Sequence, residues 1–169
     1  MLTVVFVDVV DSTGLLTSLG DARGTAAIGR VLHTVRERLE PYGGREVTAL
    51  GDGLMLTFES PRSAVAFSVA VQQRIGATRP QLRIGMNFGE TTGGDNPVGE
   101  AVNAAARIAD CAKAGEVVVS DIVRQLAGSV PGTPFVDHGR TRLKGFSGQW
   151  QLYRAVAGAS SEASLPTRS

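Results

Sequence analysis

The turn Leu50-Gly51-Asp52-Gly53 constrains the fold of this chain more than any other feature of the sequence. Apolar and polar residues alternate around it between Gly43 and Phe58. An Asp-Gly pair between two such runs is a strong short-range hairpin signal. The sequence therefore predicts two antiparallel strands, with the Asp52 carboxylate at their exposed tip.

Signals on either side of the hairpin complete a recognisable order of elements. A strand is predicted over Leu2–Val7, because this run is β-rich and almost entirely apolar. Helical signals follow from the capping residues Asp11-Ser12-Thr13 to about Tyr42-Gly43-Gly44. After the hairpin, a helix is predicted from Pro61 and a strand over Leu82–Phe88. This order of strand, helix, strand, strand, helix and strand is that of the ferredoxin-like βαββαβ arrangement.

That arrangement brings two carboxylates to one edge of the sheet. Right-handed crossovers make the first two strands parallel and insert the third between them. The end of the first strand, with Asp8, then lies beside the hairpin turn, with Asp52. Each residue alone has a simpler interpretation, since Asp8 suits a helix cap and Asp52 suits a turn. Their predicted convergence favours a metal site over both.

Two convergent carboxylates suit two divalent cations bound through oxygen, most naturally Mg²⁺ or Mn²⁺. Such a pair of ions clamps the attacking and leaving oxygens of a displacement at phosphorus. The helix start that follows is predicted to offer backbone N–H groups to a phosphate. The residues of this segment are Val9, Val10, Asp11, Ser12 and Thr13. Arg107 is a candidate for neutralising the charge that grows on the phosphoryl group in the transition state.

The rest of the chain extends this core. A Gly-rich loop over Gly89–Gly99 leads into a helix over Val98–Ala112, in which Asn103 and Arg107 share one face because they are four residues apart. The remaining predicted elements are a strand over Glu116–Ser120, a helix over Asp121–Leu126, and strands over Phe135–Leu143 and Trp150–Val156. The predicted fold class is therefore α+β, a ferredoxin-like βαββαβ core with a C-terminal αβαββ extension.

Length and charge fit one domain and exclude some partners. We expect a single domain over residues 1–156 of the 169 and a disordered tail over residues 157–169, which are small, polar and Pro-containing. Basic residues are scattered and the net charge is +1, which indicates neither a nucleic-acid-binding nor a membrane-surface protein. Cys111 is the lone cysteine, which favours a reducing, cytoplasmic setting. No apolar run approaches the roughly 20 residues that a membrane span needs.

Four motifs, in order along the chain, resemble one family. They are Phe6-Val7-Asp8-Val9-Val10-Asp11-Ser12-Thr13, Gly51-Asp52-Gly53, Gly99-Glu100-Ala101-Val102-Asn103-Ala104-Ala105-Ala106-Arg107 and Leu143-Lys144-Gly145. Any one of them alone is a weak signal. Together and at suitable spacing, they resemble the catalytic domain of the class III nucleotidyl cyclases, the adenylyl and guanylyl cyclases, over Thr3 to about Tyr153.

The resemblance implies a role for each matching residue. Asp8 and Asp52 match the two metal-binding aspartates, and Val9 matches the residue whose backbone carbonyl joins them. Asn103 matches the asparagine that orients the ribose. Arg107 matches the arginine that stabilises the transition state at the α-phosphate.

The resemblance also implies a reaction and an assembly. In the family the ribose 3′ oxygen attacks the α-phosphate and pyrophosphate leaves, so the expected activity is that of an adenylate cyclase that uses two Mg²⁺ or Mn²⁺ ions per site to make cyclic AMP from ATP. The family's sites lie at a head-to-tail dimer interface, so a homodimer is expected. The metal residues come from one chain, and Asn103, Arg107 and Lys144 from the other. Lys144 is the looser match, to a lysine near the terminal phosphates.

Two positions depart from the family pattern. Adenylyl cyclases usually carry a lysine four residues before the second metal aspartate and an aspartate three residues before the glycine that opens the Asn/Arg helix. These residues read the purine, and here they are Thr48 and Asn96. Guanylyl cyclases usually have glutamate and cysteine there, so this chain fits neither set, and GTP stays a candidate substrate beside ATP. Asp95 is next to Asn96 and would replace it if the loop shifted by one residue. Readout without a charge should weaken base selection.

Two alternatives stay open. Thr48 and Asn96 also fit a cyclase-like module that binds a nucleotide, or only a partner chain, with little or no catalysis. A palm-like nucleotidyl transferase, such as a polymerase or a diguanylate cyclase, has a related sheet. The helix with Asn103 and Arg107 argues against it, as does the absence of a Gly-Gly-acidic-acidic-Phe turn.

Overall fold

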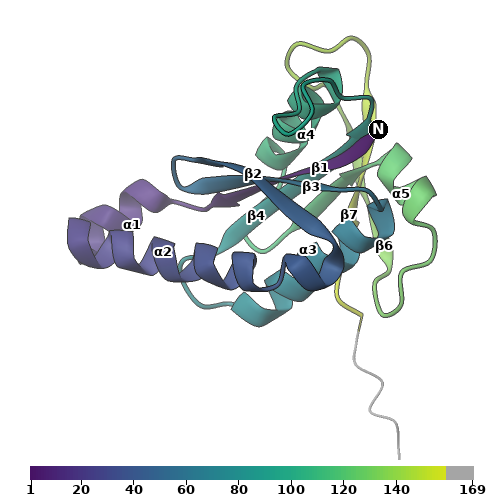
Figure 1. Cartoon of the computed structure of the whole chain (residues 1–169). Coiled ribbons are helices and arrows are strands. Elements are labelled where there is room, and N and C mark those ends of the chain that lie inside the picture. The colour runs from purple at the N-terminus through teal and green to yellow at the C-terminus, as the bar shows by residue number, and fades with distance from the viewer. Residues whose placement is uncertain (159–169) are drawn as a thin grey trace, which may run out of the picture.

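A seven-stranded sheet lies at the centre of the computed structural model, which describes residues 1–158 (Figure 1). The strands are β1 (Leu2–Val9), β2 (Gly44–Leu50), β3 (Gly53–Phe58), β4 (Leu82–Gly89), β5 (Val117–Ser120), β6 (Phe135–Thr141) and β7 (Trp150–Ala155). The helices are α1 (Ser12–Leu19), α2 (Asp21–Glu37), α3 (Pro61–Ile75), α4 (Glu100–Asp110) and α5 (Asp121–Ala127), with a 3₁₀ turn, η1 (Glu40–Tyr42). The predicted α+β fold class and the order of its elements are confirmed.

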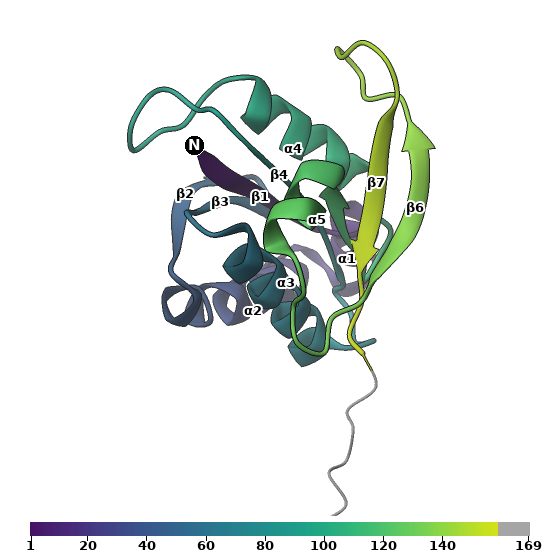
Figure 2. The ribbon, with the colours of Figure 1, turned by 90° about the vertical axis from the view of Figure 1, so that its right-hand side faces the viewer.

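Strand pairing gives the expected ferredoxin-like core. The sheet order is β2-β3-β1-β4-β5-β7-β6. Strand β3 pairs antiparallel with both β1 and β2, which makes β1 and β2 parallel with β3 between them. Strand β4 covers the other edge of β1 and pairs in parallel with β5, from which the β7–β6 hairpin continues the sheet. Figure 2 shows this hairpin beside α5, away from the β2 edge.

The alternation of β1 divides its side chains between two cores. Val5 and Val7 are buried in the larger core, on the face that α2 and α3 cover. Val4 and Phe6 point to the other face, where they pack with Ala105 of α4. Figure 1 shows α4 on one side of the sheet and α2 and α3 on the other. Because side chains alternate along a strand, Asp8 belongs to the α4 face with Val4 and Phe6.

Local sequence explains where the first helices begin and end. Asp11 caps α1 by accepting a hydrogen bond from the Gly14 amide at 3.2 Å, and it does so in the left-handed conformation that Asp tolerates. Gly20 separates α1 from α2. Helix α2 ends at Glu37, several residues before the predicted end near Tyr42, and the chain continues as η1. Pro41 accounts for this, because proline has no N–H to donate to the Glu37 carbonyl four residues earlier and its ring would collide with that carbonyl in an α-helix.

A two-armed ion pair joins α2 to β2. Arg36 Nε and Nη2 donate to the two carboxylate oxygens of Glu46 at 2.8 and 3.0 Å. These hydrogen bonds hold the pKa of Glu46 below its ordinary value and raise that of Arg36. Because the pKa of Glu46 is lower in the folded than in the unfolded chain, this ion pair stabilises the fold at pH values above the pKa of the unfolded state. The stabilisation is lost as the pH falls through the pKa of Glu46 in the folded state.

Helix α4 lies unusually close to β4. A Cβ at Gly85 would collide with the backbone of Ala109, and one at Gly89 would lie 2.9 Å from the Cβ of Ala101. The helix begins at Glu100, two residues later than predicted, because Val98 pairs with Thr92 in a β-bridge instead. Because Gly85 and Gly89 have no side chains, α4 packs closely against β4.

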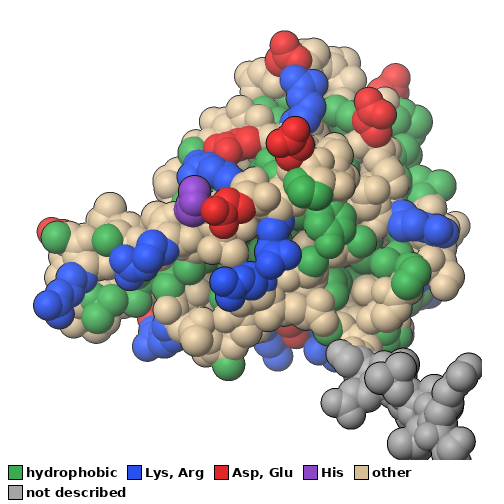
Figure 3. Space-filling model, turned by 60° about the horizontal axis from the view of Figure 1, so that its bottom comes forward, with side chains coloured by type: hydrophobic (Ala, Val, Ile, Leu, Met, Phe, Trp, Pro, Cys, Tyr) green, Lys and Arg blue, Asp and Glu red, His purple; other side chains and the backbone are tan. Residues whose placement is uncertain are grey.

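The surface and the end of the chain complete the description. On the face covered by α2 and α3, Figure 3 shows Lys and Arg side chains scattered among acidic and apolar ones. No helix within residues 1–158 is both long and apolar enough to cross a membrane. Most of the predicted tail, residues 159–169, lies outside the described part of the chain.

We expect Gly85→Ala to lower the free energy of unfolding by about 1–3 kcal/mol, the usual cost of overpacking a core contact. The added methyl group would push α4 away from β4. Gly29→Ala in α2 is the matched control, because nothing lies within 4 Å of a Cβ there and alanine favours a helix. Urea denaturation measures both variants, and a Gly85→Ala protein as stable as wild type would contradict this packing.

Candidate active site

The β1–β3 ladder brings the two predicted carboxylates together. Asp8 is the register partner of Gly53, and Asp52 precedes Gly53 in the hairpin turn. A Cβ on Gly53 would lie 2.5 Å from Asp8 Oδ1 and 2.6 Å from the Val7 carbonyl oxygen. The hairpin therefore approaches Asp8 as closely as a glycine allows. The predicted convergence of Asp8 and Asp52 at one edge of the sheet is confirmed, whereas their binding of metal stays a prediction.

The donors at this edge fit a hard divalent cation. They are two carboxylates and the backbone carbonyl of Val9, at the end of β1. No group of three or more His, Cys, Asp or Glu side chains within residues 1–158 is arranged to hold a metal ion. Mg²⁺ is commonly held by one or two carboxylates, with water and substrate phosphates completing its coordination. This donor set thus suits an ion whose other ligands are water molecules, some of which substrate phosphates replace when a substrate binds.

Arg83 is a charged neighbour of Asp8 that the sequence analysis missed. Its Nη2 donates to Asp8 Oδ2 at 3.3 Å, and the two residues are register partners across β1 and β4. The side chain of Asp8 is 36% exposed and that of Arg83 is 33% exposed. The sequence of β4 could have indicated this position, because side chains alternate between the two faces of a strand. Leu82 and Ile84 are apolar and share one face, so Arg83 between them faces the other. A guanidinium here pairs equally well with a carboxylate or a phosphate.

The start of α1 supplies fewer free donors than predicted. The Val10 amide is not available, because it donates to the Gln81 carbonyl at 2.9 Å. Ser12 and Thr13 lie in the first turn of α1, where backbone N–H groups have no acceptor within the helix. Asp11 accepts from Arg79 Nη2 at 3.3 Å as well as capping the helix. The donors that remain for a phosphate are therefore those of the first helical turn.

The residues predicted to act on the nucleotide lie on α4 and in the loop between β6 and β7. Asn103 is exposed on α4, and Arg107 contacts Asp110 of the same helix at 3.6 Å. Lys144 is exposed in the loop between β6 and β7, next to Leu143, which is buried. No hydrogen bond or ion pair in the described chain joins Asp8 or Asp52 to any of these three side chains. Within one chain, these three side chains are therefore not bonded directly to the two carboxylates.

An ion pair connects the two segments predicted to read the purine. Thr48 is exposed on β2 and Asn96 is exposed in the loop before α4. Arg45 of β2 donates to Asp95 Oδ1 of that loop at 3.1 Å. Asp95 is thus paired with β2, and the roles of Asp95 and Asn96 in reading the purine stay predictions.

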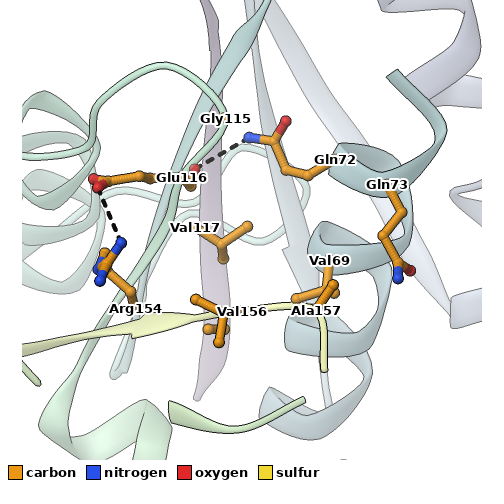
Figure 4. Close-up of a pocket in the computed structure, with 10 residues that line it drawn as sticks. Val69, Gln72, Gln73, Gly115, Glu116, Val117, Arg154, Val156 and Ala157 are labelled. Atoms are coloured by element: carbon orange, nitrogen blue, oxygen red, sulfur yellow. Dashed lines mark hydrogen bonds and ion pairs between the residues drawn. The ribbon is translucent and has the colours of Figure 1, made fainter. Parts of the chain in front are cut away.

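A separate cavity lies on the opposite face of the sheet. Its volume is about 330 Å³, and its walls come from α3, β5 and the segment after β7 (Figure 4). Val69 and Val117 line it and belong to the core on the α3 face, whereas Asp8 and Arg83 lie on the α4 face. In Figure 4 Gln72 donates to the Glu116 carbonyl, and Arg154 pairs with the Glu116 carboxylate. This cavity is therefore not part of the candidate site.

Comparison with known proteins decides the family. The family model described as "Adenylate and Guanylate cyclase catalytic domain" matches residues 1–155. The chain belongs to this family. In a solved structure, the adenylyl cyclase CyaB from P. aeruginosa has the same fold, with a TM-score of 0.82 and 26% identity over 94% of this chain and 95% of that one.

Two curated relatives are longer than this cyclase domain. An uncharacterized protein of Mycobacterium tuberculosis is 33% identical over 148 residues, which are 85% of this chain and 51% of the relative. A protein of Podospora anserina named adenylate cyclase is 28% identical over 152 residues, or 71% of this chain and 7% of the relative. The chain therefore spans about half of the first relative and a small part of the second.

We expect Gly53→Ala to weaken Mn²⁺ binding by about tenfold or more, the usual cost of displacing a metal ligand through its neighbour. The added Cβ would meet Asp8 Oδ1 and separate the hairpin from β1. Gly51→Asn is the matched control, because Gly51 has a φ of +61°, which Asn tolerates, and open space around its Cβ. Calorimetric titration with Mn²⁺ compares the two, and equal affinities would contradict a metal site between Asp8 and Asp52.

Proposed function

We propose that this domain is a class III nucleotidyl cyclase that converts ATP to cyclic AMP and pyrophosphate at the interface of a homodimer. The observation that carries the proposal is the register that sets Asp8 against the Asp52 turn, in a chain of the cyclase family. Exposed Asn103 and half-exposed Arg107 on α4 support it, because both side chains are accessible to a second chain.

The chemistry follows from these positions. The 3′ hydroxyl of the ribose loses its proton, its oxygen bonds to the α-phosphorus, and the bond from that phosphorus to the bridging oxygen of pyrophosphate breaks. Divalent ions at such a site polarise the phosphoryl oxygens and stabilise both the attacking and the leaving oxygen. Asp8, Asp52 and the Val9 carbonyl would hold two such ions, Mg²⁺ or Mn²⁺.

The remaining residues bind and orient the nucleotide. Asn103 would hold the ribose so that its 3′ oxygen lies in line with the leaving group. Arg107 would neutralise the charge that grows on the α-phosphate in the transition state. Lys144 and the free amides at Ser12 and Thr13 would bind the outer phosphates.

A head-to-tail dimer would unite the two groups of residues. Within the described part of one chain, no hydrogen bond or ion pair joins Asn103, Arg107 or Lys144 to Asp8 or Asp52, and all three side chains are at least partly exposed. A two-fold arrangement that presents α4 of one chain to Asp8 of the other would make two equal sites. Dimerisation would then be a condition for catalysis, since each chain alone holds half of each site.

Purine selection is the least constrained part of the proposal. Thr48 and Asn96 carry no charge, and the Arg45 contact keeps Asp95 on β2. Two neutral side chains discriminate adenine from guanine less than a charged pair does. We therefore propose ATP as the main substrate and GTP as a competing one.

The same observation supports one alternative function. Without a charged residue at either purine-reading position, the domain would bind nucleotides and dimerise with little or no turnover. Such a module would regulate a longer protein, which agrees with the greater length of the curated relatives. Nucleotide binding by a folded dimer that releases no cyclic product would favour this alternative.

We expect purified protein to form cyclic AMP from ATP in the presence of Mn²⁺, and less cyclic GMP from GTP. Because each site needs two chains, the rate should rise faster than linearly with protein concentration until the dimer saturates. Chromatographic product analysis over a concentration series measures both. Absence of any cyclic product at concentrations where a folded dimer is present would contradict the proposal.

We expect a mixture of Asp52→Ala and Arg107→Ala chains to recover activity that neither variant has alone. Recovery should reach about a quarter of the wild-type rate, since half of randomly formed dimers are mixed and each holds one intact site. A mixture of Asp8→Ala and Asp52→Ala chains is the matched control, because both lesions fall in the metal half and leave no intact site. Equal rates for the two mixtures, with mixed dimers verified, would contradict the shared site.

A further inference from the structure

Four charged side chains at the carboxylate edge form a continuous series of ion pairs. Arg83 Nη2 lies 3.3 Å from Asp8 Oδ2 and 3.5 Å from Asp110 Oδ1. Asp110 Oδ2 in turn lies 3.6 Å from Arg107 Nη1. One guanidinium, that of Arg83, is therefore shared between the predicted metal ligand Asp8 and the carboxylate of Asp110.

Rigid elements fix this arrangement. Asp8 and Arg83 are register partners on adjacent strands, so their side chains lie side by side on the α4 face. Asp110 is the last residue of α4, and the close approach of Ala109 to Gly85 holds that end of the helix against β4. The position of Asp110 beside Arg83 thus follows from the sheet register and the helix packing.

The competition between the two carboxylates is easily shifted. The side chain of Asp110 is 53% exposed and that of Arg83 is 33% exposed. Ion pairs with this much solvent contact are individually weak, about 0–1 kcal/mol. Neither carboxylate therefore holds the guanidinium firmly, and losing one acceptor transfers the guanidinium to the other.

We propose that Asp110 is a positioning residue that draws Arg83 away from Asp8 and so leaves the Asp8 carboxylate available to a divalent cation. The inference rests on the proposed function, in which Asp8 is a metal ligand. A cation at Asp8 and the guanidinium of Arg83 compete for Asp8 Oδ2. Asp110 gives Arg83 a second acceptor, which lowers the cost of displacing it.

General electrostatic attraction between Asp110 and a cation would also make Asp110→Asn weaken cation binding. Any carboxylate near the site attracts cations, so Asp110→Asn would weaken cation binding even without Arg83. The two explanations differ when Arg83 is absent. If Asp110 acts through Arg83, its removal has no further effect in an Arg83→Gln chain, whereas general attraction persists there.

The test is a double-mutant cycle on Mn²⁺ affinity, measured on the full chain without nucleotide by the electron paramagnetic resonance signal of free Mn²⁺. We expect Asp110→Asn to weaken binding by up to about fivefold and Arg83→Gln to strengthen it, in keeping with the size of half-exposed ion pairs. The double variant should match Arg83→Gln alone. Asp110→Glu should retain most of the wild-type affinity for Mn²⁺, because glutamate still offers Arg83 a carboxylate acceptor.

Two controls separate this inference from general effects of charge and from the proposed function. Asp121→Asn removes a carboxylate that pairs with Arg124 in α5, and it should leave Mn²⁺ affinity unchanged. Mn²⁺ binding that is lost in Asp8→Asn but unaltered in Asp110→Asn would overturn the role of Asp110 and leave the metal site standing. A loss that is equal with and without Arg83 would overturn it too. No Mn²⁺ binding by the wild-type chain would overturn the proposed metal site and this inference with it.

Discussion

The pairing of β1 with β3 is the interaction on which the rest of the candidate site depends. It sets Gly53 opposite Asp8 and thereby fixes the Asp52 turn against the end of the central strand. Only glycine fits at position 53, because a side chain would enter the space of the Asp8 carboxylate. The hairpin turn with Asp52 is thus placed beside Asp8 by main-chain hydrogen bonds, which do not depend on either carboxylate.

Helix α4 is the second part that the sheet positions. Gly85 lets the helix backbone approach β4, and this contact determines the depth of both Arg107 and Asp110 on the α4 face. The same face carries Asp8 and Arg83, so basic and acidic groups alternate along one edge instead of repelling one another. In our interpretation these ion pairs hold the charges of a cyclase site in a balanced state, which cations and a nucleotide would rearrange.

The side chains proposed to read the purine and bind the outer phosphates lie on the hairpin and on loops, and not on the central strands. Thr48, Asn96 and Lys144 lie on the hairpin and on two loops, in exposed positions. Loops carried by a rigid sheet are well suited to reach a neighbouring molecule. In the function that we propose, these groups would meet the carboxylates of a second copy of the chain.

The sequence by itself determined the order of the elements, the fold class, the hairpin turn and the convergence of Asp8 with Asp52. These features follow from local signals, namely caps, turn residues and apolar periodicity, combined with the handedness of crossovers. The ends of helices were predicted less accurately, since α2 ends before Pro41 and α4 begins after Gly99. Only the tertiary structure decided that Arg83 pairs with Asp8 and Asp110, that Arg45 holds Asp95, and that the Val10 amide is already bonded. Such partners come from strands and loops far apart in the chain. Their contacts depend on strand register and on the depth of helix packing, where a shift of one residue reverses the face of every side chain.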